Sequence, residues 1–145
     1  MNRLASLSVV MVILAAVLRE TSGVIIMAQQ DLTAKLIRSK CQPESGASTE
    51  AIEGVREGKF PDDRNLKCYM SCAMTMSLTM RDGKLAVDLT KSIIERMMQG
   101  DTKARALAAV DKCSNSDAGL SDACDIAFAA TKCIHDADPD ILTFP

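Results

Sequence analysis

The sequence predicts an all-α fold of six helices that disulfides hold together, and three observations support this prediction. Aromatic residues make up 3% of the 145 residues and Trp is absent, so the core must consist of Leu, Ile, Val, Met and Ala. Ala, Leu and Met favour helices, whereas strands are rich in aromatic and β-branched residues. Apolar residues recur at helical spacing in segments separated by Gly, Pro, Asn and Asp. The chain contains six cysteines, an even number, and is long enough for one domain.

Residues 1–23 have the pattern of a secretory signal peptide. A positive charge lies near the start, and Leu4–Leu18 is an apolar run that is too short and too rich in Ser and Ala for a membrane span. We expect cleavage after Gly23, with cleavage after Ala28 as the alternative. A first buried helix or a membrane anchor is the competing interpretation. The prediction is therefore a secreted protein whose residues 24–145 form one domain, with no membrane insertion of the mature chain.

The first half of this domain contains three predicted helices, separated by turns at 41–46 and 58–63 that contain Gly and Pro. They are a helix that ends at Cys41, a short polar helix capped by Ser48 or Thr49 that runs through Val55, and a helix from Arg64 to about Thr79. On the third helix, Cys68 and Cys72 are four residues apart and point from the same face. They cannot easily pair with each other there, so each must bond a different partner.

The second half contains the other three predicted helices, and no strands are expected. Asp82 and Gly83 form a turn, Gly100 ends the fourth helix, and 114–119 is a polar loop. The helices are Leu89–Met98 with Asp88 as N-cap, a helix capped by Asp101 or Thr102 that leads into Cys113, and Ala123 to about Asp136 capped by Ser121 or Asp122. Pro139 stops the last helix. The apolar tail, 139–145, is predicted to fold back onto the body, because an apolar end is unfavourable in water.

All six cysteines lie after the signal segment, which predicts three disulfides in an oxidising compartment. Six cysteines allow fifteen pairings, and spacing by itself does not select one of them. The spacing is Cys-x26-Cys-x3-Cys-x40-Cys-x10-Cys-x8-Cys, starting at Cys41. This pattern resembles the insect odorant-binding protein family, the six-cysteine, six-helix kind that includes pheromone-binding proteins. The resemblance covers nearly all of the chain after the signal segment.

Several segments agree with this resemblance: Leu66–Cys72, the Asp82-Gly83 turn, Cys124–Phe128, and the apolar end after Pro139. The resemblance implies a helical shell that encloses a hydrophobic cavity. It also implies three disulfides, which are Cys41–Cys72, Cys68–Cys124 and Cys113–Cys133. The implied ligand is a small hydrophobic molecule such as an odorant, a pheromone or a fatty-acid-like compound.

The apolar helix faces, together with family-like positions, suggest which residues line such a cavity. They are Met74, Leu78, Leu89, Ile93, Ile94, Met97, Ala106, Leu107, Val110, Phe128 and Ile134, with Leu142 and Phe144 as a lid. Ordinary core packing is the alternative for each. Small side chains at Ala106, Ala109, Ala129 and Ala130 would leave room for a ligand or permit close helix packing. Tyr69, Thr143 and the tail amides are candidate donors to a ligand, although a structural, partly exposed place is the favoured prediction for Tyr69.

The sequence argues against several other functions. A formal charge of −2 without a run of Lys or Arg gives no reason to bind nucleic acid or an anionic membrane. With His135 as the single histidine, and without zinc-ligand spacing, we expect no catalytic residue, no metal and no cofactor. His135 lies among acidic residues before the tail, and resemblance to pheromone-binding relatives leads to the hypothesis that its protonation loosens the tail.

The resemblance therefore implies a secreted carrier that binds small hydrophobic odorants or pheromones and transports them through aqueous fluid. An olfactory receptor and a second copy of the chain are candidate partners. One alternative is a non-olfactory carrier or scavenger in saliva, venom, seminal fluid or haemolymph. Another is a disulfide-rich helical signal protein that binds a receptor through its surface. The sequence does not distinguish the ligand, the tissue or the oligomeric state.

Overall fold

The computed structural model describes residues 10–13, 32–142 and 144–145, and the chain divides into two compact units, Met1–Leu36 and Ile37–Pro145. In the first unit, residues 10–13 and 32–36 are helical. The rest of the predicted signal segment, both predicted cleavage positions and Thr143 lie outside the described residues. No helix in the described part of the chain is both long enough and apolar enough to cross a membrane.

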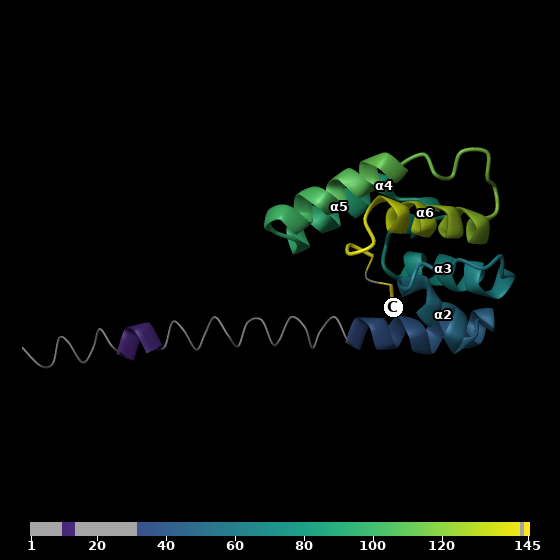
Figure 1. Ribbon diagram of the computed structural model, residues 1–145, viewed down its shortest axis with the longest axis horizontal. Coiled ribbons are helices and arrows are strands. Elements are labelled where there is room, and N and C mark those ends of the chain that lie inside the picture. Colours follow the sequence, from purple (N-terminus) through teal and green to yellow (C-terminus); the bar gives the residue numbers. More distant parts are fainter. Residues whose placement is uncertain (1–9, 14–31, 143) are drawn as a thin grey trace, which may run out of the picture. The chain divides into compact units, whose positions relative to one another are not determined.

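The second unit is helical, as the composition predicts, and also contains one small hairpin (Figure 1). After a helical segment at 37–45, its elements are α2 (Thr49–Arg56), α3 (Arg64–Met76), β1 (Met80–Arg81), β2 (Lys84–Leu85), α4 (Val87–Met97), α5 (Gly100–Cys113) and α6 (Ala123–Ala137). α6 packs against α3 on one side and α5 on the other, and α5 also packs against α4. The predicted helical, disulfide-bonded fold class is confirmed.

The hairpin corrects the prediction that the chain has no strands. β1 and β2 pair antiparallel, with Met80 opposite Leu85. Asp82 and Gly83 form the predicted turn, and both have positive φ, 51° and 75°. Such a two-residue turn matches the right-handed twist of a strand pair. Composition does not reveal these strands, because each is only two residues long.

The first helix of the second unit continues further than the turn residues suggest. Residues 41–45, including Pro43, remain helical, so the helix ends later than the break predicted at 41–46. Gly46 ends the helix with φ +72°, and its N–H bonds the Gln42 carbonyl at 2.9 Å, as is typical of a glycine C-cap.

Two of the predicted caps are confirmed. The Ser48 hydroxyl accepts a hydrogen bond from the Ala51 N–H at 3.1 Å, which begins α2. The Asp122 carboxylate accepts from the N–H groups of Cys124 and Asp125, which begins α6. These side chains bond amides that have no partner within the helix.

The predicted start of α4 is wrong by two residues. The helix begins at Val87, and the residue before it, Ala86, provides no side-chain cap. Asp88 therefore lies inside the first turn rather than at the N-cap. Its negative charge is still favourable there, because it lies near the positive end of the helix dipole.

The boundary between α4 and α5 also differs from the prediction. Gly100 is the first residue of α5, with φ +60°, rather than the end of α4. Gln99 takes the N-cap position, and no side-chain hydrogen bond caps the helix. Asp101 and Thr102 therefore lie within α5. The chain changes direction at Gly100, whose φ is positive, and so the helix has begun before either residue.

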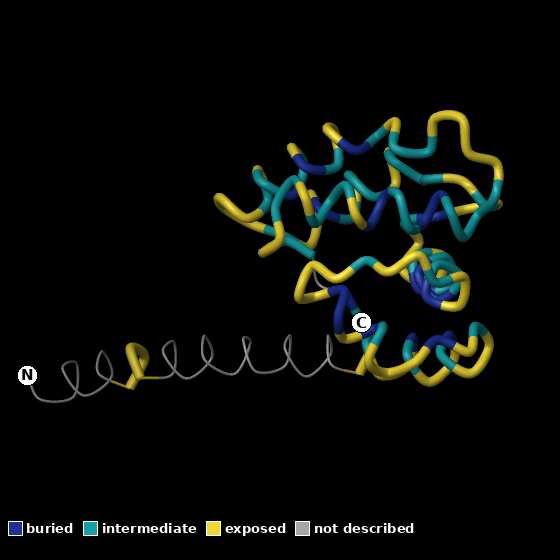
Figure 2. The backbone as a smooth tube through the Cα atoms, turned by 45° about the vertical axis from the view of Figure 1, so that its right-hand side comes forward, coloured by how far each residue is buried: buried dark blue, intermediate teal, exposed yellow. Residues whose placement is uncertain are grey.

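The core of the second unit lies mainly between α2, α3 and α6. Its largest fully buried side chains are Tyr69, Ile52, Leu66, Met70, Met80, Val55 and Cys41. Figure 2 shows buried positions recurring along the helices between exposed ones, as expected for amphipathic helices. Three disulfides cross-link the unit: Cys41–Cys72, Cys68–Cys124 and Cys113–Cys133. These are the pairs that the resemblance implies, and α3 is bonded in two directions.

Candidate binding pocket

A partly open pocket of about 310 Å³ lies between the end of α3, β2, α4, α5, α6 and the C-terminal tail. Most of the surface that lines it is apolar. The lining residues are Ala73, Met74, Ser77, Thr79, Leu85, Val87, Thr90, Ile94, Met98, Ala106, Ala109, Val110, Cys113, Ser114, Ala130, Thr131, Ile134, Ile141, Leu142, Phe144 and Pro145. None of these described residues has a charged side chain. A small apolar molecule fits such a site in size and polarity.

The structure places part of the predicted lining around this pocket and part of it elsewhere. Around the pocket lie Met74, Ile94, Ala106, Val110, Ile134, Leu142 and Phe144. The other predicted residues, which are not part of the lining, are Leu78, Leu89, Ile93, Met97, Leu107 and Phe128. Of the predicted residues outside the lining, all but Leu78 lie on helices that contribute to the pocket, but on other faces of those helices.

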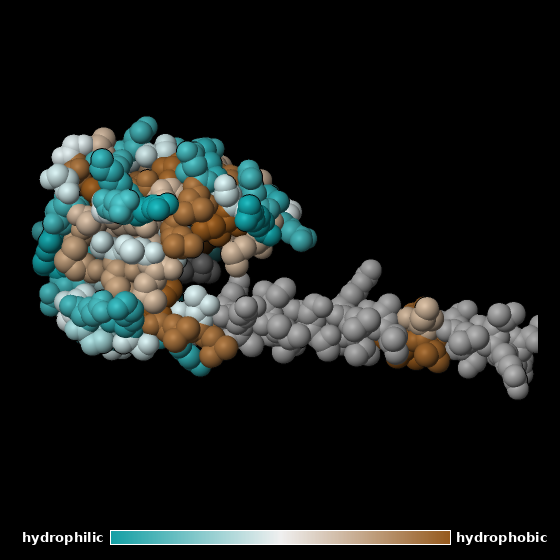
Figure 3. All heavy atoms as spheres, turned by 180° about the vertical axis from the view of Figure 1, so that it is seen from behind, coloured by the Kyte–Doolittle hydropathy of each residue, from teal (hydrophilic) through white to brown (hydrophobic). Residues whose placement is uncertain are grey.

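The largest difference concerns α4, which has apolar residues on two faces. Ile94 is buried and lines the pocket, and half-buried Val87 at the start of the helix also lines it. Leu89 and Met97 lie on another face and are 39% and 73% exposed. Since both faces are apolar in the sequence, periodicity does not show which one turns inward. On the face drawn in Figure 3, hydrophobic atoms likewise reach the surface between hydrophilic ones.

Leu78 and Phe128 have other surroundings. Leu78 follows the end of α3 with φ +61° and is 58% exposed, because the chain has already left the helix there. The Phe128 ring packs edge-on against Phe60, with centroids 5.9 Å apart, and the Lys67 ammonium lies 5.2 Å from the Phe128 centroid. Phe128 therefore belongs to a separate aromatic contact.

Three of the four alanines noted in the sequence help to create the pocket volume. Ala106 and Ala109 on α5 and Ala130 on α6 line the pocket and are buried. A larger side chain at any of them would occupy part of the pocket. Ala129 is not part of the lining. The small residues noted in the sequence therefore leave room in three positions.

Sequence reasoning missed the polar part of the lining. Five hydroxyl side chains border the pocket: Ser77, Thr79, Thr90, Ser114 and Thr131. A signal was present for two of them, since Thr90 lies four residues before Ile94 and Thr131 three before Ile134, which places each on the same helix face as a lining residue. The predicted lining contains only apolar residues, and the predicted donors are Tyr69 and groups of the tail, so these hydroxyls are not among them.

The C-terminal tail forms one wall of the pocket and is anchored at its end. The Arg56 guanidinium donates two hydrogen bonds to the Phe144 carbonyl, at 2.8 and 2.5 Å. The Tyr69 hydroxyl donates to the main-chain oxygen of Pro145 at 2.7 Å, and the Tyr69 and Phe144 rings meet edge-on. Phe144 is buried. The tail thus folds back onto the body, as the sequence predicts.

Tyr69 corrects a sequence expectation. It is fully buried rather than partly exposed, and its hydroxyl bonds the tail. Burial raises the pKa of this hydroxyl above its ordinary value, so it remains a donor at neutral pH. Its role is to hold the tail in place.

The start of the tail is held by an ion pair. Arg105 on α5 donates two hydrogen bonds to the Asp138 carboxylate, both at 2.6 Å, and lies 3.3 Å from Asp140. Hydrogen bonding to Arg105 lowers the pKa of Asp138 below its usual range. His135 has other neighbours. Its ring centroid is 5.4 Å from that of Phe60, and its Nδ1 is 3.7 Å from the Asp136 carboxylate.

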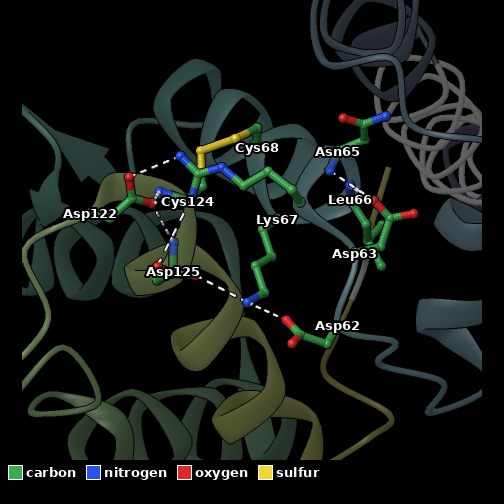
Figure 4. Close-up of polar contacts among 10 residues, drawn as sticks. Asp62, Asp63, Asn65, Leu66, Lys67, Cys68, Asp122, Cys124 and Asp125 are labelled. Atoms are coloured by element: carbon green, nitrogen blue, oxygen red, sulfur yellow. Dashed lines mark hydrogen bonds and ion pairs between the residues drawn. A yellow bond between two sulfur atoms is a disulfide. The ribbon is translucent and has the colours of Figure 1, made fainter.

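Charged residues also surround the disulfide between α3 and α6 (Figure 4). The Arg64 guanidinium bonds both carboxylate oxygens of Asp122, at 2.7 and 2.9 Å, and Lys67 bonds Asp62 and Asp125, at 2.5 and 3.1 Å. The Arg64 hydrogen bonds, with the two helix amides, lower the pKa of Asp122 well below its usual range. Ionised Asp122 therefore joins the start of α3 to the start of α6.

This pKa shift predicts how stability depends on pH. Because the pKa of Asp122 is lower in the folded than in the unfolded chain, its contribution is complete above about pH 4, the ordinary range of Asp, and is lost as the pH falls toward the folded value. We expect the free energy of unfolding of Asp122→Asn to fall less steeply below pH 4 than that of the parent. Denaturant titrations at several pH values measure this difference. Glu95→Gln, at an exposed position inside α4, is the matched control for the loss of one carboxylate.

The described part of the chain contains no candidate metal site. Its six cysteines are all in disulfides, and no group of three or more His, Cys, Asp or Glu side chains there could hold a metal ion. The features that remain are three interlocking disulfides, a helical shell and an apolar pocket closed on one side by the tail. Together they define a class of small, disulfide-bonded binding proteins.

Comparison with known proteins identifies the family within this class. The model of the PBP/GOBP family matches residues 25–137, and the chain belongs to this family. General odorant-binding protein 72 of Anopheles gambiae is 29% identical over 117 residues, covering 81% of this chain and 96% of the relative. General odorant-binding protein 19a of Drosophila melanogaster is 27% identical, covering 77% of each chain. The resemblance stated from the cysteine spacing is confirmed.

Solved structures agree with this assignment. Odorant binding protein 4 of Chrysopa pallens superposes with a TM-score of 0.73 at 26% identity, covering 81% of this chain and 97% of the other. Odorant binding protein 5 of Apis mellifera superposes with a TM-score of 0.74 at 27% identity, covering 81% and 96%. The chain therefore has the fold of a family that carries small hydrophobic ligands.

Proposed function

We propose that residues 24–145 form a secreted carrier that binds a small hydrophobic odorant or pheromone in the pocket and transports it through aqueous fluid. The observation that carries the proposal is the pocket itself, about 310 Å³ in volume and lined mainly by apolar side chains from four helices and the tail. Family membership supports a carrier rather than an enzyme. The pattern of residues 1–23 and the three disulfides support secretion.

The energetics of such a carrier are consistent with this proposal. Space that side chains leave unfilled forfeits packing contacts, and a bound apolar molecule regains them. The disulfides offset the missing contacts in the unliganded protein, because each restricts the unfolded chain. A ligand of roughly ten to sixteen heavy atoms can supply the roughly −8 kcal/mol of micromolar binding.

Filling the pocket tests the proposal. Ala109 lines the pocket and is buried, whereas its neighbour Ala108 lies on the exposed face of the same helix. We expect Ala109→Leu to weaken binding of an apolar fluorescent probe about tenfold, which equals about 1.4 kcal/mol, because the larger side chain occupies ligand volume. Ala108→Leu, the matched control, should bind like the parent.

Probe titration of the oxidised protein measures both affinities, and circular dichroism checks that each variant is folded. Unchanged binding in a folded Ala109→Leu protein would place the ligand outside this pocket. If the parent binds neither the probe nor any of a panel of alcohols, aldehydes, esters and fatty acids, the carrier function itself is contradicted.

A further inference from the structure

The polar groups of the pocket carry information about the ligand. Five hydroxyl side chains border it, from the end of α3, the approach to β1, α4, the end of α5, and α6. No described lining residue is charged. A hydroxyl has one hydrogen to donate and two lone pairs that accept. What the pocket offers a ligand therefore depends on where these hydrogens already go.

The two hydroxyls in the middle of helices donate to their own helices. The Thr131 hydroxyl donates to the Ala127 carbonyl at 2.8 Å, and the Thr90 hydroxyl donates to the Ala86 carbonyl at 2.9 Å. Thr131 is buried, so water does not readily replace its bond. Each of these threonines has used its only hydrogen and retains lone pairs.

The other three hydroxyls have the same arrangement. Ser77, Thr79 and Ser114 donate to nearby main-chain oxygens at 2.8, 3.1 and 2.9 Å. Pro145, at the end of the tail wall, has no N–H. The side-chain polar groups of the pocket are thus acceptors toward a ligand, and a ligand carbonyl would have to break one of these bonds to gain a side-chain donor.

The arginines near the tail do not offer a ligand a positive charge inside the pocket. Arg56 bonds the Phe144 carbonyl, and Arg105 bonds Asp138, and neither arginine lines the pocket. A carboxylate ligand would lose its hydration without gaining a cation, which is costly in an apolar site. The described lining therefore disfavours anionic ligands.

We propose that this pocket selects uncharged ligands that donate a hydrogen bond, with aliphatic alcohols as the ligand class, over aldehydes, ethers, esters and carboxylates of the same length. The inference rests on the proposed carrier function and specifies its ligand. An alcohol donates its O–H to the oxygen of Thr131 or Thr90, the two threonines within helices, without disturbing the bond that this oxygen already makes. An aldehyde or an ether has only acceptor atoms, and the side-chain hydroxyls of the pocket have no free hydrogen to donate to them.

The test uses ligands that differ only in their head group. The oxidised full-length protein is loaded with an apolar fluorescent probe, which is displaced at neutral pH by a straight-chain alcohol of about ten carbons or by its aldehyde, methyl ether or carboxylate. We expect the alcohol to bind about tenfold more tightly than the aldehyde and the ether, the difference that one additional hydrogen bond provides. The carboxylate is expected to bind most weakly.

Threonine variants identify the acceptors. Thr131→Val and Thr90→Val keep the side-chain shape and remove the oxygen, and in the double variant the alcohol should bind no more tightly than the aldehyde. Thr75→Val is the matched control. Thr75 lies exposed on α3, outside the lining, and its hydroxyl also donates to the carbonyl four residues earlier, that of Ser71 at 2.8 Å. It should retain the full preference for the alcohol.

Two results would overturn the inference while leaving the carrier function intact. One is that the probe binds and the aldehyde or the carboxylate displaces it as well as the alcohol does. The other is that the folded double variant keeps the parental preference. If instead no ligand and no probe binds the parent protein, the proposed function fails together with the inference.

Discussion

Replacing both Cys68 and Cys124 by alanine is expected to lower the free energy of unfolding by about 4 kcal/mol. This disulfide joins residues 56 apart in the sequence, the largest separation of the three, and the entropy that a cross-link removes from the unfolded chain grows with loop length. It also joins α3 to α6, whose packing contributes to the core and whose ends provide pocket residues. We therefore expect this variant to lose more stability than a variant that lacks either other disulfide.

The matched comparison is the pair Cys113→Ala and Cys133→Ala. This disulfide spans 20 residues, so the same relation predicts a loss of about 3 kcal/mol. Denaturant titration of both proteins, with the remaining cysteines oxidised, measures the two losses. An equal or smaller loss for the Cys68–Cys124 variant would show that loop entropy does not govern the stability of this fold.

The second large effect concerns the tail. Phe144→Ala is expected to weaken ligand binding at least about tenfold, because Phe144 is 4% exposed, packs against Tyr69 and forms part of the pocket wall. Truncation of a buried Phe costs about 3–5 kcal/mol in a rigid core. Here the tail can detach locally, so the loss in global unfolding should be smaller, on the order of 1 kcal/mol.

Two further variants distinguish an effect of the tail on ligand binding from a general effect of substitution. Arg56→Gln removes the guanidinium that bonds the Phe144 carbonyl, and it should weaken binding in the same direction. Met97→Ala truncates an exposed residue of α4 outside the pocket and should bind like the parent. Probe titration with parallel denaturant curves provides both measurements. Unchanged affinity in Phe144→Ala would mean that the tail does not contribute to the binding site.

The helical fold class could be predicted because its signals are local in the sequence. Ser48 and Asp122 cap helices whose first amides are only two or three residues away. The interval of three residues between Cys68 and Cys72 places both on one face of α3, which prevents their pairing with each other. The short strands and the Gly100 boundary escaped because they depend on one or two residues in unusual backbone conformations.

The pocket could be predicted only in part, because burial depends on what packs against a helix. Ile94 and Met97 are equally apolar in the sequence, yet one lines the pocket and the other is exposed. Thr131 resembles any helical threonine until its neighbours are known. Phe128 is an apolar residue of α6 that packs on Phe60 and has no part in the lining.

The sequence by itself determined the helical class, the number of disulfides and, through the cysteine spacing, the family. These properties depend on residue type and on distance along one chain. Only the tertiary structure decided which face of α4 turns inward, that Tyr69 is buried beneath the tail, and that the pocket hydroxyls have already used their hydrogens. Such properties arise where segments distant in sequence meet, because a side chain's burial and hydrogen bonds depend on the neighbours that folding brings to it.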